Sequence, residues 1–220
     1  MADLWRTALV TVVERIDRPC QLAGVEWALA GSAATALQGC SLTPRDIDIL
    51  LRAPGGVDRL SRLMERYAPL ATNEKVGTEG WVSSRTMPIA DENDPDGFHW
   101  HWARWLVKGV KVEAAHIRAP NGAQGREPGI WENGPEIWSL HRLTRLGPHS
   151  IRVPPLEVQL ATCARRGLAT RVEAIIEVLL RDGVDGDLLR RCLAEPDVQG
   201  LLNRLSEAPR IRRGRELRPK

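Results

Sequence analysis

Two aspartates, Asp46 and Asp48, alternate with isoleucines in residues 46–51. Side chains of a β-strand point alternately to its two faces, so this run predicts a strand with both carboxylates on one face. Carboxylates held side by side are hard oxygen ligands of the kind that Mg²⁺ prefers. Glu113, in the later run VKVEAAHI, offers a third carboxylate from a neighbouring strand. The sequence therefore predicts an acidic centre suited to divalent cations.

A glycine and a serine, Gly31 and Ser32, lie between a predicted short strand at 25–29 and a predicted helix that ends at Gly39, and thirteen residues separate Ser32 from Asp46. A glycine lets backbone approach a ligand closely, and a serine hydroxyl with helix N-terminal amides can hold phosphate. Taken alone, the pair is more often an ordinary strand-to-helix turn with a serine cap. Only its combination with the paired aspartates favours a phosphate site.

The order of strand, Gly-Ser turn, helix and Asp-x-Asp strand resembles the nucleotidyltransferase superfamily that includes DNA polymerase β. The small bacterial aminoglycoside and lincosamide nucleotidyltransferases and the toxin-type enzymes are especially similar. The resemblance covers residues 25–117. It implies transfer of a nucleoside monophosphate from a nucleoside triphosphate (NTP) such as ATP to a hydroxyl acceptor, with release of pyrophosphate and two Mg²⁺ ions as cofactors.

The resemblance also implies roles for individual residues. Asp46, Asp48 and Glu113 would be the catalytic metal ligands, Glu113 on the metal that activates the acceptor hydroxyl, while Gly31 and Ser32 would hold the triphosphate. Glu113 departs from the aspartate that is common in the family, and the substitutes that the acidic loop offers are Asp91, Asp94 and Asp96.

Three arginines, Arg45, Arg165 and Arg166, would reach the triphosphate if the helical half of the chain folds over the site. Surface arginines are the commoner explanation, because all but four of the 31 basic residues are arginine and a GC-rich genome accounts for such a bias.

The alternative of a zinc site is raised by three histidines, His99, His101 and His116, but no cysteine lies close enough in sequence to complete such a site. The tryptophans around them form an aromatic sheet face or stack an acceptor or base.

The sequence leaves the identity of the acceptor and of the partners open. A formal charge of +3 favours a small-molecule acceptor, whereas the arginine-rich tail at residues 210–220 is compatible with a tRNA or protein acceptor. A homodimer is also open. The alternative from another functional class is a non-catalytic, antitoxin-like protein of this fold that binds a nucleotide or a protein. The alternative without a functional site is that Asp46 and Asp48 lie on the solvated face of an edge strand.

The expected helices and strands that position these residues correspond to an α+β fold. We expect a mixed sheet flanked by helices over residues 1–150, followed by an all-helical domain over residues 151–220. The apolar spacing predicts a helix at 3–17 capped by Asp3, a helix at 57–67 and four short helices after Pro155. Strands are expected at 81–89 and in a hairpin of 98–107 with 110–117 that turns at Lys108-Gly109, with a loop at 90–97.

Composition narrows the remaining classes. With 220 residues, 43% of them hydrophobic, the chain has no apolar run long enough to span a bilayer, and its first residues do not read as a signal peptide. We therefore expect no membrane partner and a cytoplasmic location. The four cysteines contain no CxxC pair, which predicts reduced, mostly buried side chains.

Overall fold

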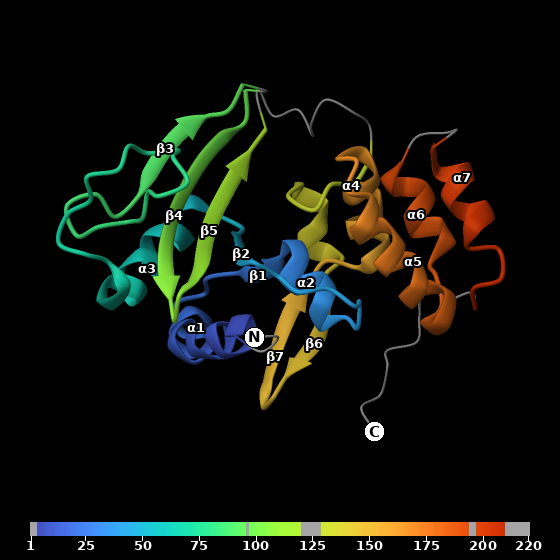
Figure 1. Ribbon diagram of the computed structural model, residues 1–220, viewed down its shortest axis with the longest axis horizontal. Helices are drawn as coiled ribbons and strands as arrows, with labels where there is room; N and C mark the ends of the chain where they lie inside the picture. Colours follow the sequence, from blue (N-terminus) through green and yellow to red (C-terminus); the bar gives the residue numbers. More distant parts are fainter. Residues whose placement is uncertain (1–3, 96, 120–128, 194–196, 210–220) are drawn as a thin grey trace.

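The computed structural model describes residues 4–95, 97–119, 129–193 and 197–209. A five-stranded sheet and its helices form one side of the molecule, and a cluster of helices forms the other (Figure 1). The elements in chain order are α1 (Leu4–Leu22), β1 (Trp27–Ala30), α2 (Gly31–Leu37), β2 (Asp46–Leu51), α3 (Pro54–Met64), η1 (Glu65–Tyr67), β3 (Ala90–Asn93), β4 (His99–Val107), β5 (Val110–Arg118), η3 (Pro135–Ser139), β6 (Arg142–Leu146), β7 (His149–Val153), α4 (Leu156–Arg165), α5 (Ala169–Asp182), α6 (Gly186–Cys192) and α7 (Asp197–Arg204).

The sheet is mixed, and its strand order is β1-β2-β5-β4-β3. Among the described strands of the sheet, β2 and β5 run parallel and the other neighbouring pairs are antiparallel. The parallel pair lies in the middle of the sheet and joins the two segments in which the carboxylates were predicted. The expected α+β fold, with a mixed sheet, flanking helices and helices at the carboxyl end, is confirmed.

One face of the sheet is apolar and is covered by α1 and α3. Ile47 and Ile49 of β2 and Val112 of β5 lie in the same buried cluster as Leu9 of α1 and Leu60 of α3. Because side chains alternate along a strand, this packing leaves the polar residues of β2 and β5 on the opposite face. Burial of the isoleucines therefore fixes where the aspartates point.

The helices α4 to α7 pack around a second apolar cluster, which also includes Ile130 and Ile137 from the segment before β6. The hairpin β6-β7, which the sequence did not predict, contributes Leu146 and Ile151 to the core of the sheet instead. Between residue 129 and α4, the chain therefore contributes apolar side chains first to the helical cluster, then to the core of the sheet, and then to the helical cluster again. The division at residue 150 stays a prediction.

Several predicted elements are confirmed with shifted ends. The helix expected at 3–17 continues through Pro19, because Cys20 extends its buried face, and its proposed cap Asp3 lies outside the described residues. The hairpin turns at Lys108 and Gly109, both at positive φ (52° and 79°), as a two-residue turn between twisted strands requires.

The strand expected at 81–89 is wrong, and the loop expected at 90–97 is wrong over residues 90–93. The strand is β3, Ala90–Asn93, which pairs with β4 and buries only Ala90. As the last strand of the sheet it needs backbone pairing on one side only, so an acidic sequence without an apolar pattern suffices. Trp81 is fully buried from a segment without regular structure.

All four cysteines are free and buried, as predicted. Burial raises the pKa of the Cys20 and Cys40 thiols to about 11 and that of Cys192 to about 12. In the described part of the chain no helix has the length and apolar character needed to cross a bilayer.

Candidate active site

The two aspartates occupy one face of β2, as their alternation predicted. Asp46 and Asp48 are partly exposed, whereas Ile47, Ile49 and the residues after them are buried. The parallel pairing of β2 with β5 places Asp48 directly opposite Glu113, and Asp46 opposite Lys111. Three carboxylates and one ammonium group therefore share the face of the sheet that α1 and α3 leave free.

Asp48 stands at the centre of this group. Desolvation, together with the negative charges of Asp46, Glu113 and Glu132, raises the pKa of its carboxyl to about 7. The nearby ammonium of Lys111 acts in the opposite direction. Such crowding of carboxylates is unfavourable unless positive charge enters the group, and perturbed carboxyls of this kind gather at functional sites.

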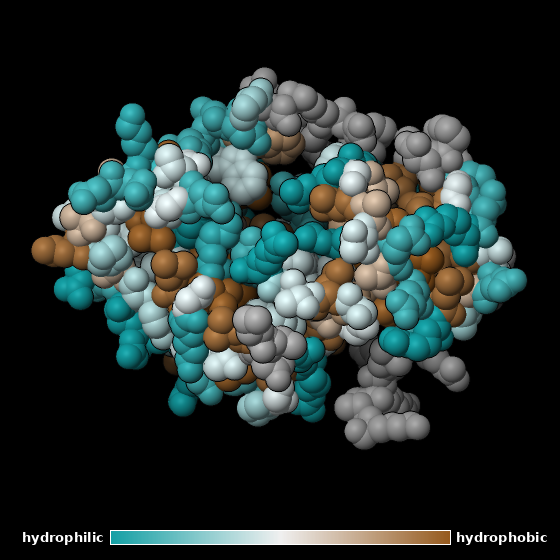
Figure 2. All heavy atoms as spheres, in the orientation of Figure 1, coloured by the Kyte–Doolittle hydropathy of each residue, from teal (hydrophilic) through white to brown (hydrophobic). Residues whose placement is uncertain are grey.

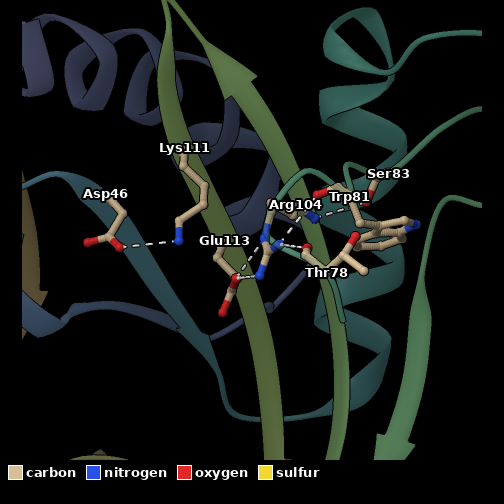
Figure 3. Close-up of polar contacts among 7 residues, drawn as sticks. All are labelled: Asp46, Thr78, Trp81, Ser83, Arg104, Lys111 and Glu113. Atoms are coloured by element: carbon tan, nitrogen blue, oxygen red, sulfur yellow. Dashed lines mark hydrogen bonds and ion pairs between the residues drawn. The ribbon is translucent and has the colours of Figure 1, made fainter. Parts of the chain in front are cut away.

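Two basic side chains already supply positive charge to the group. The Lys111 ammonium lies 3.5 Å from Asp46 Oδ2, and the Arg104 guanidinium lies 2.8 Å from Glu113 Oε2. Figure 3 shows Glu113 between these two basic residues, with Lys111 directed to Asp46 on one side and Arg104 approaching from β4 on the other. Asp46 and Glu113 are therefore ion-paired within the chain.

The donor set has the chemistry of a divalent-cation site, since it is made of carboxylate oxygens and carries an excess of negative charge. Within the described ranges, no three His, Cys, Asp or Glu side chains stand close enough to hold a metal in their present positions. Each ion pair directs a carboxylate toward a basic side chain. The donor set thus fits Mg²⁺ by ligand type and by strand register, provided that Lys111 and Arg104 release Asp46 and Glu113.

Asp91 and Asp94, two of the substitutes offered by the acidic loop, are not brought to this group. Asp91 Oδ1 lies 2.8 Å from His101 Nδ1. Asp94 accepts hydrogen bonds from the Phe98 amide and the Trp100 indole. Asp96 lies outside the described residues. Glu113 is therefore the acidic side chain that neighbours Asp48 across the strands.

Gly31 is the first residue of α2 and follows β1 directly. Its φ of +60° is a left-handed conformation that favours glycine, and a Cβ there would collide with Asp48 Oδ2. The sequence predicted that Gly31 lets the backbone come close to a ligand; what the structure brings close is the Asp48 carboxylate. Ser32 follows it, buried in the first turn of α2.

A fourth carboxylate, Glu132, was missed by the sequence analysis. Its Oε1 accepts hydrogen bonds from the Gly31 amide (2.7 Å) and from Gln159 Nε2 of α4 (3.0 Å). Gln159 Nε2 also lies 3.1 Å from the Gly31 carbonyl, and Gln38 Nε2 lies 2.9 Å from Gln159 Oε1. This network joins α2 and the segment near residue 132 to α4, beside Asp48. No sequence pattern predicts a role for Glu132, because it lies in an irregular segment 101 residues after Gly31.

The three arginines differ in their surroundings. Arg45 and Arg166 are exposed. The Arg165 guanidinium donates to the carbonyl groups of Ile130 and Cys192 and lies over the ring of Trp131. Arg165 therefore joins α4, α6 and the segment near residue 130, and its proposed contact with a triphosphate stays a prediction, as do those of Arg45 and Arg166.

Two of the histidines, His99 and His101, contact carboxylates other than those of Asp46, Asp48 and Glu113. His101 is on the β4 face opposite Arg104 and contacts Asp91 and Asp58, while His116 Nδ1 contacts the Leu51 carbonyl. Trp81 and Trp102 pack edge to face with centroids 4.7 Å apart, on the same face as Glu113. The aromatic sheet face expected as the alternative to zinc is therefore present in part.

The surface is hollowed between β5 and α4, where the sheet and the helical part of the molecule meet (Figure 2). Two further depressions lie elsewhere. One, of about 620 Å³, is open between α5 and α7, and the other, of about 270 Å³, lies beside Trp5 and Cys40. Neither is lined by Asp46, Asp48 or Glu113.

Comparison with known proteins supports the fold. No protein-family model matches the sequence, and no curated protein matches it. Among solved structures, the chain is similar to the "putative nucleotidyltransferase (TM1012)" of Thermotoga maritima, with a TM-score of 0.53 and 20% identity over 80% of this chain and 92% of that one.

Two further solved structures match less well. The antibiotic-resistance factor ANT(2'')-Ia has a TM-score of 0.45 at 10% identity, covering 89% of each chain. An antigenic nucleotidyltransferase-like protein from Paracoccidioides brasiliensis also has a TM-score of 0.45 at 10% identity, covering 91% of this chain and 93% of that one. Of these three structures, the Thermotoga protein alone has a TM-score above 0.5. The predicted resemblance to nucleotidyltransferases is thus confirmed at the level of the fold.

Proposed function

We propose that this protein is a nucleotidyltransferase that moves a nucleoside monophosphate from an NTP to a hydroxyl acceptor and releases pyrophosphate. The observation that carries the proposal is the register pair of Asp48 with Glu113, with Asp46 two residues away on the same face. The fold that this chain shares with the Thermotoga protein supports this chemistry, but only as an analogy of fold.

In this proposal Asp46, Asp48 and Glu113 would hold and orient two Mg²⁺ ions, which would supply charge neutralisation for the triphosphate and a lowered pKa for the acceptor hydroxyl. Lys111 and Arg104 would be released from their present partners, and Lys111, on the same face, would be available to a phosphate oxygen. Gly31 keeps the start of α2 against Asp48, so the Ser32 end of the helix stays beside the carboxylates.

The acceptor is proposed to be a small molecule, because a near-neutral chain suits a compact pocket better than a long nucleic-acid track. A tRNA or protein acceptor is the alternative. Acceptor binding separates them, because a nucleic acid that contacts several basic residues loses affinity steeply as salt rises.

A non-catalytic nucleotide- or protein-binding role is the second candidate. The observation in its favour is that Asp46 and Glu113 are ion-paired within the chain and that the described residues hold no ready-made metal cluster. Its prediction differs sharply, since a module that works through these ion pairs needs no divalent cation.

The deciding experiment is calorimetric titration of the protein with each NTP, with and without Mg²⁺. The double variant Asp46→Asn/Asp48→Asn is compared with Asp187→Asn, which alters a carboxylate that is 96% exposed on α6. We expect Mg²⁺-dependent binding in the wild type and the control and none in the double variant. Absence of NTP binding in the wild type overturns the transferase and moves the non-catalytic role to first place.

A further inference from the structure

Arg104 makes more contacts around the carboxylates than any role in the proposal above requires. Its Nε and one terminal nitrogen lie 3.0 and 2.8 Å from Glu113 Oε2, and its side chain is only 12% exposed. The other terminal nitrogen donates to the Thr78 carbonyl at 2.9 Å and lies 3.4 Å from the Trp81 carbonyl. One guanidinium therefore holds both a carboxylate of the site and a turn of the segment before β3 (Figure 3).

The backbone of Arg104 holds the same segment. Its amide donates to Ser83 Oγ at 2.9 Å, and its carbonyl accepts from the Ser83 amide at 2.7 Å. The Trp81 amide donates to the Thr78 carbonyl, the group that the guanidinium also binds. The segment 78–84 has no regular secondary structure of its own, so these contacts give it a fixed position against β4.

The strand order gives this arrangement a direction. Gly31 and α2 follow β1 on one side of Asp48, and Glu113 of β5 lies on the other side, with Arg104 of β4 and segment 78–84 beyond it. In the proposed reaction the triphosphate lies toward Gly31 and Glu113 serves the acceptor hydroxyl. The segment 78–84 then borders the acceptor side.

We propose that Arg104 is a positioning residue that couples the orientation of Glu113 to the position of segment 78–84, so that the third carboxylate and the acceptor side of the site are set together. Both of its contacts with Glu113 reach Oε2, which leaves Oε1 outside the ion pair. An acceptor that shifts segment 78–84 moves the guanidinium and, through it, the carboxylate. Conversely, a cation that draws Glu113 away loosens the hold of Arg104 on the segment. The acceptor side of this inference rests on the proposed function, whereas the coupling itself does not.

The test is hydrogen exchange of the backbone amides of residues 78–84, measured by mass spectrometry on the full chain. Glu113→Gln removes the charge that holds the guanidinium and keeps the size of the side chain, and Arg104→Lys keeps the charge without the planar fork. Glu26→Gln and Arg52→Lys are the matched controls, because they alter an exposed pair of the same type, 2.6 Å apart, at β1 and β2. We expect about tenfold faster exchange in segment 78–84 in both site variants, as the loss of a charge-assisted hydrogen bond predicts, and no change in the controls.

A second measurement separates coupling from a purely structural role. Adding Mg²⁺ with a non-hydrolysable ATP analogue to the wild type is expected to change exchange in segment 78–84, and Arg104→Lys is expected to abolish that change while the nucleotide still binds. Unchanged exchange in Glu113→Gln overturns the inference even if nucleotide binds. If the wild type binds neither Mg²⁺ nor nucleotide, the proposed function fails, and the first measurement still decides whether Glu113 and the segment are coupled.

Discussion

Asp48 and Glu113 face each other across the one parallel pair among the described strands, and the desolvation of the Asp48 carboxyl makes their like charges unfavourable. Lys111 and Arg104 lie close to this group and offset part of the repulsion. Removal of one carboxylate therefore has opposite consequences for stability and for ligand binding, which is the expected trade-off at a functional site.

Asp48→Asn is expected to stabilise the protein by about 1 to 2 kcal/mol at pH 8 without divalent cations, because a neutral amide is not repelled by Asp46 and Glu113. The same variant is expected to lose Mg²⁺-dependent NTP binding. Urea denaturation and calorimetry measure the two effects. A variant that is less stable than the wild type at pH 8 would mean that Asp48 has a structural role that outweighs the repulsion.

Lys111→Met is expected to tighten binding of Mn²⁺, a probe for Mg²⁺, because the ammonium group that pairs with Asp46 no longer competes with the metal. A change of about twofold to fivefold corresponds to one partly exposed ion pair. Lys108→Met, at the exposed hairpin turn, is the control for the loss of one positive charge. Equal effects in the two variants would reduce the result to net charge alone.

The pH dependence of stability should carry a signature of His141, which packs edge to face on Trp138. Burial, with a smaller effect of Arg152, lowers the pKa of His141 to about 4 from 6.5. Because the folded state resists protonation, this group gives full stability above pH 6.5 and loses it as the pH falls toward 4. The expected loss is about 2 kcal/mol over that window.

His141→Phe keeps the aromatic packing and removes the titration, so its stability should fall less than that of the wild type between pH 6.5 and 4. His149→Phe, on the β6-β7 hairpin, is the control. Parallel stability curves for the wild type and His141→Phe across this window would show that His141 is protonated in the folded state as easily as in the unfolded state.

Local patterns carried much of the sequence prediction. The two-residue period of residues 46–51 placed Asp46 and Asp48 on one face, and Lys108-Gly109 marked the hairpin turn, because both features depend on neighbours in sequence. The first helix and the four helices after Pro155 followed from apolar spacing in the same way.

The features that escaped prediction depend on contacts between distant residues. β3 is set by its pairing with β4 and carries no apolar alternation of its own. The contact of Glu132 with Gly31 and the pairing of Arg104 with Glu113 arise only when separate strands and loops meet. A sequence pattern indicates which face a carboxylate occupies, but the partners of that carboxylate are determined by the tertiary fold.

Gly31 gives the sharpest test of such a tertiary requirement, because Gly24 offers a matched control. Both glycines have nearly the same positive φ, +60° and +64°, but a Cβ at Gly24 meets nothing within 4 Å, whereas one at Gly31 collides with Asp48. Gly24→Ala is expected to cost about 1 kcal/mol, the strain of a left-handed alanine. Gly31→Ala should cost at least twice as much and should weaken Mg²⁺-dependent NTP binding by displacing Asp48. Urea denaturation of both variants separates the backbone strain from the collision. Equal costs would mean that Asp48 moves aside freely, and nucleotide binding would then be preserved as well.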